Sequence, residues 1–370
     1  MTELYLIRHV QAVGNCYHML QGHWDGGVTR DGEKQRQLLE KRFAGEKIDA
    51  VYSSDLYRAM YTAGAVADPR GLRIHPVKEL REIDIGPWQN CFLADIEYET
   101  PEPAAAFLKG DTGWHLDGAE TFPQVAERAF GALEKIALAH PGEIVAAVSH
   151  GITCRSVLQK ITGVEDALQL PISGNTAVTK LIYDNGGFTV EYFNDMSHLG
   201  PLPQKKWGEG GSLRAESLDP RKEASWYEHC YASAWREIHG SLRDYSPELY
   251  LEAASLHHRK NSGSVLKMYC GDTAAGIVDL DPEKGSDRGI GWISLLYLEE
   301  DFRGRGLGDQ LLGRAVAFYE GLGRTALGLN VSEHNGRGLA FYKKWGFEVT
   351  GIRTNSLGKL YRMEKELKNE

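Results

Sequence analysis

The sequence has few cysteines, and they form no recognisable pattern. Five cysteines are scattered through 370 residues without a C-x-x-C pair: Cys16, Cys91, Cys154, Cys230 and Cys270. This spacing indicates neither a disulfide framework nor a zinc site. We therefore expect no metal site, and a reducing compartment fits best.

Long apolar runs are also missing. No stretch approaches the roughly 20 apolar residues that a helix needs to cross a bilayer. The N-terminal stretch MTELYLIRH is too short and too polar for a signal peptide. These two absences predict a cytoplasmic protein that does not enter a membrane.

The chain has no excess of positive charge. Lysine and arginine number 42 against 51 acidic residues, for a formal net charge of −9. Nonspecific nucleic-acid binding needs a basic surface, so this class of partner is disfavoured. Any anion site has to be built locally, and we expect small molecules as partners; the oligomeric state is left open.

The first half of the chain alternates short apolar strands with helical patterns. Strands are predicted over residues 4–7, 50–52 and 144–148, and helices over 31–43, 56–66, 122–139 and 152–161. A hairpin is predicted over 176–183 and 188–193. Strands that alternate with helices predict an α/β fold with a mostly parallel sheet between two helical layers.

Proline and glycine then gather between two regions of ordinary composition. Residues 196–212 contain Pro201, Pro203 and several glycines with little apolar content. We predict a first domain over residues 1–200, a linker over 201–211 and a second domain over 212–370. The second domain has a helix around 221–239, antiparallel-looking strands over 265–270, 274–280 and 292–298, and a strand over 325–331, which indicates an α+β fold.

Charged and polar side chains of the first half fall where predicted strands end. In open α/β sheets, ligands bind beyond the carboxyl ends of the strands. Arginine can hold a phosphate through two hydrogen bonds, and helix N-termini favour anions. Two arginines, two histidines, an acid and a helix start therefore predict a phosphate pocket with a nucleophile and a proton donor: Arg8, His9, Arg58, His150, Gly151, and either Glu82 or Asp84 as the acid.

The ordered motifs of this half resemble the histidine phosphatase superfamily, which includes the phosphoglycerate mutases. They are R-H, an asparagine six residues later, S-S-D-x-x-R-A, L-x-E-x-x-x-G and S-H-G. The resemblance implies a phosphoglycerate mutase-like fold and hydrolysis through a phosphohistidine at His9, without a cofactor. It also implies that Glu82 is the general acid. Asp84 stays as a rival by position, because it lies two residues on and shares a face with Glu82 if the segment is extended. The phosphoryl group would be bound by Arg8, Asn15, Arg58, His150 and Gly151.

The chain departs from the family pattern at several positions. Val10 follows the histidine where glycine is usual, and Gln11 stands where glutamate is frequent. Residues 83–86 do not match the Arg-His-Tyr-Gly run of the mutases. These differences favour a phosphatase, and a mutase-type phosphotransferase stays as an alternative.

A glycine-rich turn marks the second half. Residues 303–308 read R-G-R-G-L-G, and apolar residues at helical spacing follow. Backbone N–H groups at such a helix start can bind a pyrophosphate, and glycine lets the backbone approach it closely. A nicotinamide site is the main rival, but the preceding strands look antiparallel and no second βα unit follows.

The run R-x-x-G-x-G, with the later asparagine and Tyr342, Gly346 and Phe347, resembles the GNAT acetyltransferase superfamily. The resemblance implies acetyl-CoA as cosubstrate and Tyr342 as the acid that protonates the departing thiolate. Asn335 would lie near the pantetheine arm. The expected cofactor-binding residues are Leu298, Arg303, Gly304, Arg305, Gly306, Leu307, Gly308 and Asn335.

The base that would activate the amine is not identified by the pattern. Glu299, Glu300 and Glu333 are candidates by position only, and His257 and His258 are expected on a solvated helix end. The leading hypothesis is a bifunctional enzyme acting on a small phosphate ester and a small amine. The alternative is an active phosphatase with an acyl-CoA-binding regulatory module.

Overall fold

A computed structural model describes residues 1–200, 202 and 210–367 of the chain, so most of the predicted linker lies outside the described residues. The chain forms two compact units. The first contains residues 1–15 and the chain from Met19 to the linker. The second contains residues 16–18 and the chain after the linker. No helix among the described residues is long and apolar enough to cross a membrane.

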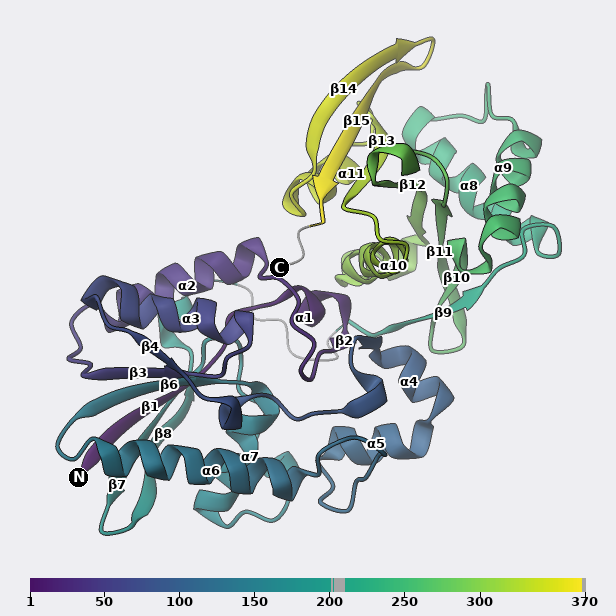
Figure 1. The fold of residues 1–370 in the computed structure, drawn as a ribbon. Coiled ribbons are helices and arrows are strands. Elements are labelled where there is room, and N and C mark those ends of the chain that lie inside the picture. Colours follow the sequence, from purple (N-terminus) through teal and green to yellow (C-terminus); the bar gives the residue numbers. More distant parts are fainter. Residues whose placement is uncertain (201, 203–209, 368–370) are drawn as a thin grey trace. The chain divides into compact units, whose positions relative to one another are not determined.

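The first unit is built on a six-stranded sheet with the order β4-β3-β6-β1-β7-β8 (Figure 1). Its strands are β1 Thr2–Arg8, β3 Ala50–Ser53, β4 Ile74–Pro76, β6 Ile144–Ser149, β7 Val178–Asp184 and β8 Gly187–Asp195. The pairs among β4, β3, β6 and β1 are parallel, and β7 and β8 form the antiparallel hairpin. Short strands β2 Met19–Leu20 and β5 Cys91–Phe92 pair separately.

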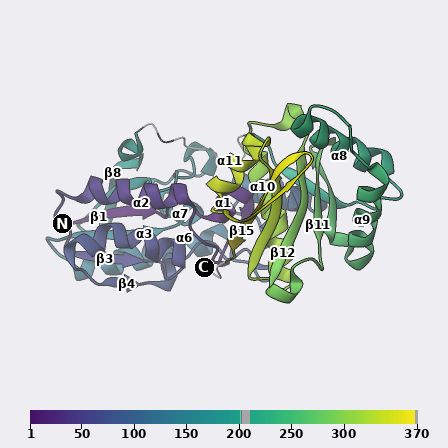
Figure 2. The same ribbon diagram turned by 90° about the horizontal axis from the view of Figure 1, so that it is seen from above.

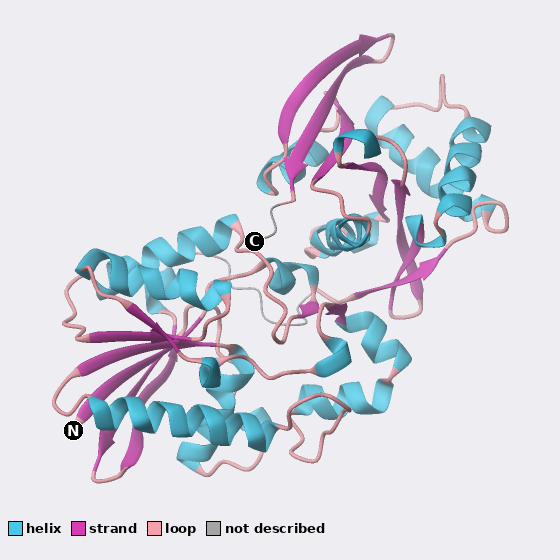
Figure 3. Ribbon diagram, in the orientation of Figure 1, coloured by secondary structure: helices cyan, strands magenta, loops and turns pink. Residues whose placement is uncertain are grey.

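Helices cover both faces of this sheet (Figure 3). α2 Arg30–Phe43 and α3 Tyr57–Ala67 pack on one face, and α6 Phe122–Ala139 and α7 Gly151–Thr162 pack on the other. The other helices before the linker are α1 Val13–Tyr17, α4 Leu93–Glu99 and α5 Pro101–Lys109. Two of the predicted helices begin at side-chain caps. The Thr29 hydroxyl accepts a hydrogen bond from the Gly32 N–H, and Thr121 and Gln124 form a capping box.

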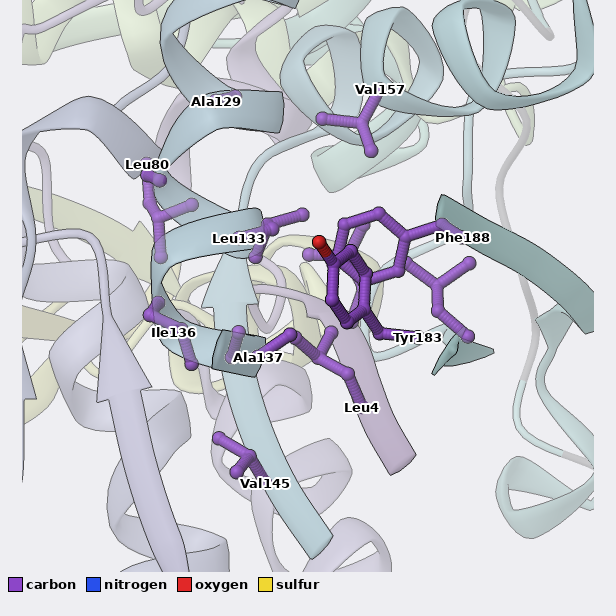
Figure 4. Close-up of a cluster of buried hydrophobic side chains, with 14 of the residues drawn as sticks. Leu4, Leu80, Ala129, Leu133, Ile136, Ala137, Val145, Val157, Tyr183 and Phe188 are labelled. Atoms are coloured by element: carbon purple, nitrogen blue, oxygen red, sulfur yellow. The ribbon is translucent and has the colours of Figure 1, made fainter. Parts of the chain in front are cut away.

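The alternation of side chains along β1 explains the two helical layers, because successive strand residues point to opposite faces. Leu4 and Leu6 pack in the core under α6 and α7, as Figure 4 shows for Leu4 beside Leu133 and Ile136. Tyr5 and Ile7 pack in a second core under α2 and α3. The predicted three-layer α/β/α fold is confirmed.

The second unit has a seven-stranded mixed sheet with the order β14-β15-β13-β12-β11-β10-β9. The strands are β9 Leu213–Ser217, β10 Val265–Cys270, β11 Thr273–Asp281, β12 Ile290–Leu298, β13 Ala326–Ser332, β14 Glu348–Asn355 and β15 Gly358–Glu366. Only β12 and β13 pair in parallel. The predicted α+β architecture is therefore confirmed.

Four helices complete the second unit: α8 Ala224–His239, α9 Pro247–Lys260, α10 Leu307–Gly321 and α11 Gly336–Lys344. α8 and α9 lie side by side in both ribbon views (Figures 1 and 2). Their apolar residues pack on Val265 of β10 and Ile277 of β11. α9 has no range among the helices predicted from the sequence, although Pro247 at its start is a recognised helix-start signal.

Candidate active sites

The register of three parallel strands brings the first set of predicted residues to one edge of the sheet. Arg8 at the end of β1 lies opposite Ser149 at the end of β6, and Ser53 of β3 lies opposite Val148. The residues that follow these strands are therefore neighbours. The imidazole rings of His9 and His150 have centroids 5.1 Å apart.

One cavity of about 130 Å³ gathers most of the predicted phosphatase residues. His150 lies beside it and is fully buried next to His9. The predicted residues that line the cavity are Arg8, His9, Asn15, Arg58, Glu82 and Gly151. The structure thus brings together a set that the chain spreads over more than 140 positions.

Contacts of the His9 ring fix the nitrogen that faces the cavity. Its Nδ1 lies 2.6 Å from the Val10 carbonyl oxygen, and a carbonyl oxygen can only accept. A neutral ring therefore has its proton on Nδ1 and a free lone pair on Nε2. Burial, followed by the charges of Arg58 and Arg8, holds the pKa of His9 well below its ordinary value, so the ring is uncharged near neutral pH.

Several buried polar atoms around His9 have no hydrogen-bond partner within the described chain. They are Nε of Arg8, Nε of Arg58 and Nδ1 of His150. Buried polar groups are nearly always paired, so these unpaired nitrogens around His9 point to a ligand rich in acceptor oxygens. A phosphoryl group has that character.

Other contacts hold these groups in place. The Nη atoms of Arg58 donate to the carbonyl oxygens of Trp24 and Gly22, each at 2.8 Å, and burial lowers the pKa of this arginine to about 10. The Nε2 of His150 lies 2.8 Å from the Ser54 hydroxyl. The side-chain oxygen of Asn15 accepts from the Ala12 N–H at 2.9 Å, which leaves its amide N–H groups available.

Glu82 lies at the N-terminus of α7. Its carboxylate accepts hydrogen bonds from the N–H and hydroxyl of Thr153 and the N–H of Ile152, at 3.0 to 3.2 Å. The rival acid Asp84 accepts from Gly86 and Gln89 and does not line the cavity. The geometry therefore favours Glu82 as the proton donor.

One charged residue of this cavity is absent from the predicted set. Arg155 lies four residues after Gly151 on α7, and its side chain is 4% exposed. Helical spacing from Gly151 is the signal that would have found it. The other lining residues absent from that set are mostly apolar and include Leu20, Ile83, Ile85, Phe107, Leu108, Ile152 and Ile172.

The second unit contains a larger cavity, of about 490 Å³. β12 and β13 pair only from Ile290 to Ile293 and from Ala326 to Leu329, and the rest of each strand is unpaired with the other. The unpaired segments, residues 294–296 and 330–332, line the cavity. Two parallel strands that separate in this way leave backbone groups free for an extended ligand.

The predicted glycine-rich turn leads directly into α10. Gly304 and Gly306 have φ angles of 75° and 82°, which favour glycine. Within the described chain, the N–H groups of Gly304, Arg305 and Gly306 make no hydrogen bond. The N–H groups of Leu307 and Gly308 lie in the first turn of the helix and have no helical partner. This arrangement fits a pyrophosphate.

Two of the predicted cofactor residues hold the turn through other contacts. The Nε of Arg303 donates to the Leu298 carbonyl oxygen at 2.7 Å, and its Nη atoms pair with Glu237. The Arg303 side chain is therefore committed to Glu237. Its backbone N–H donates to the Glu300 carbonyl oxygen at 3.1 Å, so the N–H groups that can meet a ligand begin at Gly304. Leu298 ends β12 and does not line the large cavity.

Tyr342 and Asn335 both line the large cavity. The Asn335 side chain accepts a hydrogen bond from the Gly338 N–H at 2.8 Å and so caps α11. Within the described residues, the Tyr342 hydroxyl makes no hydrogen bond. Burial raises the pKa of Tyr342, so the phenol keeps its proton at neutral pH.

The acids of this cavity differ from the predicted base candidates. Asp279 and Asp281 are the acidic residues among its described lining, and the structure does not bring Glu299, Glu300 or Glu333 to it. Glu299 instead pairs with His229 at 2.7 Å, and Glu333 accepts from the Lys359 N–H at 2.7 Å.

The prediction that His257 lies on a solvated helix end is wrong. Its side chain is 10% exposed, with Nδ1 2.8 Å from Asp279 and Nε2 3.4 Å from Asp281. It lies three residues after buried Ala254, on the face of α9 that packs against the sheet. Burial opposes the charge on His257, but the hydrogen bonds to the two carboxylates outweigh it and raise its pKa to about 9.

Each half of the chain matches the model of the family that its sequence motifs resemble. Residues 4–196 match the model of the histidine phosphatase superfamily (branch 1), and residues 224–347 match that of the acetyltransferase (GNAT) family. The chain belongs to the histidine phosphatase superfamily, and its second unit carries a GNAT domain.

Individual relatives resemble the first half. A protein of Arabidopsis thaliana named metal-independent phosphoserine phosphatase is 31% identical over 217 residues, 58% of this chain and 90% of the relative. Phosphoserine phosphatase 1 of Hydrogenobacter thermophilus is 28% identical over 165 residues, 45% of this chain and 78% of the relative. The solved structure of Bacillus stearothermophilus YhfR has a TM-score of 0.52 and 30% identity, and covers 54% of this chain and all of YhfR.

Proposed function

We propose that the chain is a bifunctional enzyme. Its first unit hydrolyses a small phosphate monoester through a phosphohistidine at His9, and its second unit transfers an acetyl group from acetyl-CoA to a small amine. The observation that carries the first activity is the set of unpaired buried nitrogens around His9, from Arg8, Arg58 and His150. The names of the two phosphatase relatives support hydrolysis over transfer to a second substrate.

The first step of the proposed hydrolysis forms a bond between Nε2 of His9 and phosphorus. The ester P–O bond breaks, and Glu82 gives its proton to the leaving oxygen. The Nδ1 proton remains bound to the Val10 carbonyl. Negative charge on the transferring group is stabilised by Arg8, Arg58 and His150, because preorganised donors lower the barrier where charge develops.

The second step consumes water. Water attacks phosphorus and gives its proton to the Glu82 carboxylate while the P–N bond breaks. Inorganic phosphate is released, His9 returns to its neutral form, and Glu82 is again protonated for the next cycle. The same residue thus acts first as acid and then as base.

The second unit fits acetyl-CoA through the turn at residues 304–308, whose N–H groups suit the pyrophosphate, and through the separated strands β12 and β13. When bound, acetyl-CoA supplies an activated acetyl group. Tyr342 holds a proton on its Oη at the cavity. It would give this proton to the thiolate that leaves when the bond from the acetyl carbon to sulfur breaks and the bond to the amine nitrogen forms. The proton that the amine loses would restore the Tyr342 hydroxyl. A regulatory acyl-CoA module is the alternative for this unit.

Hydrolysis is tested with the full chain on p-nitrophenyl phosphate and a panel of small phosphate monoesters. His9→Ala should lose at least about 1000-fold in kcat, because no other nucleophile occupies its position. The matched control is His115→Ala, which removes an exposed histidine of the same unit and should keep full activity. Full activity of His9→Ala would overturn the proposal for the first unit.

Acetyl transfer is tested by following free thiol release from acetyl-CoA in the presence of small amines, including phosphorylated ones. The proposal expects thiol release that depends on one of the amines. Binding of acetyl-CoA without release with any amine would favour the regulatory alternative. A phosphorylated amine that is both dephosphorylated and acetylated would link the two activities.

A further inference from the structure

Arg155 is a buried cation of the phosphatase cavity that the proposed chemistry does not use. Its side chain is 4% exposed, and it lines the cavity with Arg8, Glu82 and Gly151. Nε of Arg155 is buried without a partner, and within the described residues its guanidinium makes no hydrogen bond or ion pair. A buried arginine is normally paired, so the unpaired guanidinium of Arg155 indicates a binding site for a ligand.

The surroundings of Arg155 show where such a ligand would lie. Arg155 and Gly151 are four residues apart on α7, so they share one face of the helix about 5–6 Å apart. The phosphate-binding groups are at the Gly151 end, where a Cβ on that glycine would lie 3.3 Å from Cζ of Arg8. Arg155 therefore lies one helical turn away from the phosphate position.

Within the described residues, the remaining wall of the cavity supplies no substitute partner: Gln21 also lines it, but its buried Oε1 makes no hydrogen bond. Phe107, Leu108 and Ile172 line it as apolar side chains. Gly110 leaves room for the guanidinium, since a Cβ there would lie 2.9 Å from Nη2 of Arg155. Glu82 is the carboxylate that interacts electrostatically with Arg155, but it is bound to Thr153 and Ile152.

We propose that Arg155 is a specificity residue that binds a carboxylate of the substrate, so that the first unit prefers compact phosphate esters carrying a carboxylate a few bonds from the ester oxygen. This inference rests on the proposed phosphatase function and deepens it. A planar guanidinium matches a carboxylate through two parallel hydrogen bonds. The small cavity, about 130 Å³, suits a compact ester, and one helical turn matches the separation of its two anionic ends.

The test uses two matched substrate pairs with the full chain. Phosphoserine and phosphoethanolamine differ by one carboxylate, and so do 3-phosphoglycerate and glycerol 3-phosphate. The parent should prefer the carboxylate member of at least one pair in kcat/KM by on the order of 10- to 100-fold. In Arg155→Met this preference should fall to within about threefold of unity, mainly through a higher KM.

Two further variants separate binding from structure. Arg155→Lys keeps the charge but loses the paired geometry, so it should restore part of the preference. Lys160→Met removes the same charge from an exposed position of α7 and should leave the preference as in the parent. Thermal unfolding of each variant checks that the fold is retained.

The possible outcomes distinguish a failure of the role of Arg155 from a failure of the phosphatase function. No carboxylate preference in the parent, or an equal loss on both members of each pair in Arg155→Met, overturns the role of Arg155. If Arg155→Met does not fold, Arg155→Lys decides: an unchanged preference overturns the role, and a reduced one supports it. If the parent hydrolyses no phosphate ester and forms no phosphohistidine, the phosphatase function itself fails.

Discussion

The rings of His9 and His150 lie 5.1 Å apart at the ends of two neighbouring parallel strands, and their contacts are complementary. His9 has Nδ1 at a carbonyl and Nε2 free, whereas His150 has Nε2 at the Ser54 hydroxyl and Nδ1 free. Two residues of one type are thus suited to different tasks. One can attack phosphorus, and the other can donate to a phosphoryl oxygen.

Both rings should stay uncharged well below the usual pKa of histidine. Burial and the nearby arginines lower both values, so protonation requires a pH clearly below 6.5. Ring resonances of His9 and His150, assigned by substitution and followed by NMR from pH 8 to 5.5, should not titrate. The unfolded chain in urea is the control, since its histidines titrate near about 6.5. A midpoint near 6.5 for His9 in the folded chain would contradict this expectation.

Ser54→Ala removes the partner of His150 Nε2. The ring then loses the hydrogen bond that fixes its tautomer, and kcat/KM for phosphate esters should fall about tenfold. Ser53→Ala is the matched control, because its equally buried hydroxyl bonds to the Ser54 carbonyl and not to a histidine. An equal effect of both substitutions would show a packing defect and not a role for the hydrogen bond.

His257→Gln should change how the stability of the second unit depends on pH. The folded pKa is raised to about 9, above the unfolded value, so the stabilisation is complete below about pH 6.5 and is lost as pH rises through 9. Urea unfolding of the full chain should show a deficit of on the order of 1–3 kcal/mol at pH 6.5 that shrinks by pH 9.5. His258→Gln is the neighbouring control, and a deficit for His257→Gln that is independent of pH would refute the account.

Tyr342→Phe should reduce amine-dependent thiol release by about 100-fold, because the departing thiolate loses its proton donor. Acetyl-CoA affinity, measured by calorimetry, should change less than threefold, since only one hydroxyl is removed. Tyr361→Phe is the control, as Tyr361 does not line the cavity. Unchanged turnover in Tyr342→Phe would show that the proton comes from elsewhere.

The order of strands and helices could largely be predicted from the sequence, because hydrophobic periodicity and caps are local signals. The strand ends that hold Arg8, His9 and His150 follow from three apolar segments that pair in parallel. Residues that approach from other directions were harder to place. Arg155 lies inside a helix predicted for its packing; its spacing from Gly151 places the two residues on one face, and the fold shows that this face of α7 opens onto the cavity.

In the second unit, tertiary packing places site residues that local sequence patterns do not predict. His257 precedes basic residues at a helix end, a pattern typical of a solvated terminus, and yet two carboxylates on β11 meet its ring. That contact joins residues more than 20 positions apart through tertiary packing. The base candidates Glu299, Glu300 and Glu333 rest on position in the sequence only, and the strand segments that line the cavity bring Asp279 and Asp281 to it instead.

The central claim, a covalent phosphohistidine at His9, is tested most directly by stopping the reaction within milliseconds of mixing with a phosphate ester and mapping the phosphorylated residue by mass spectrometry. The account predicts one acid-labile, base-stable phosphoryl group on His9 that disappears at the rate of phosphate release. Hydrolysis at full rate with the phosphoryl group on another residue, or with none on the protein, would contradict it.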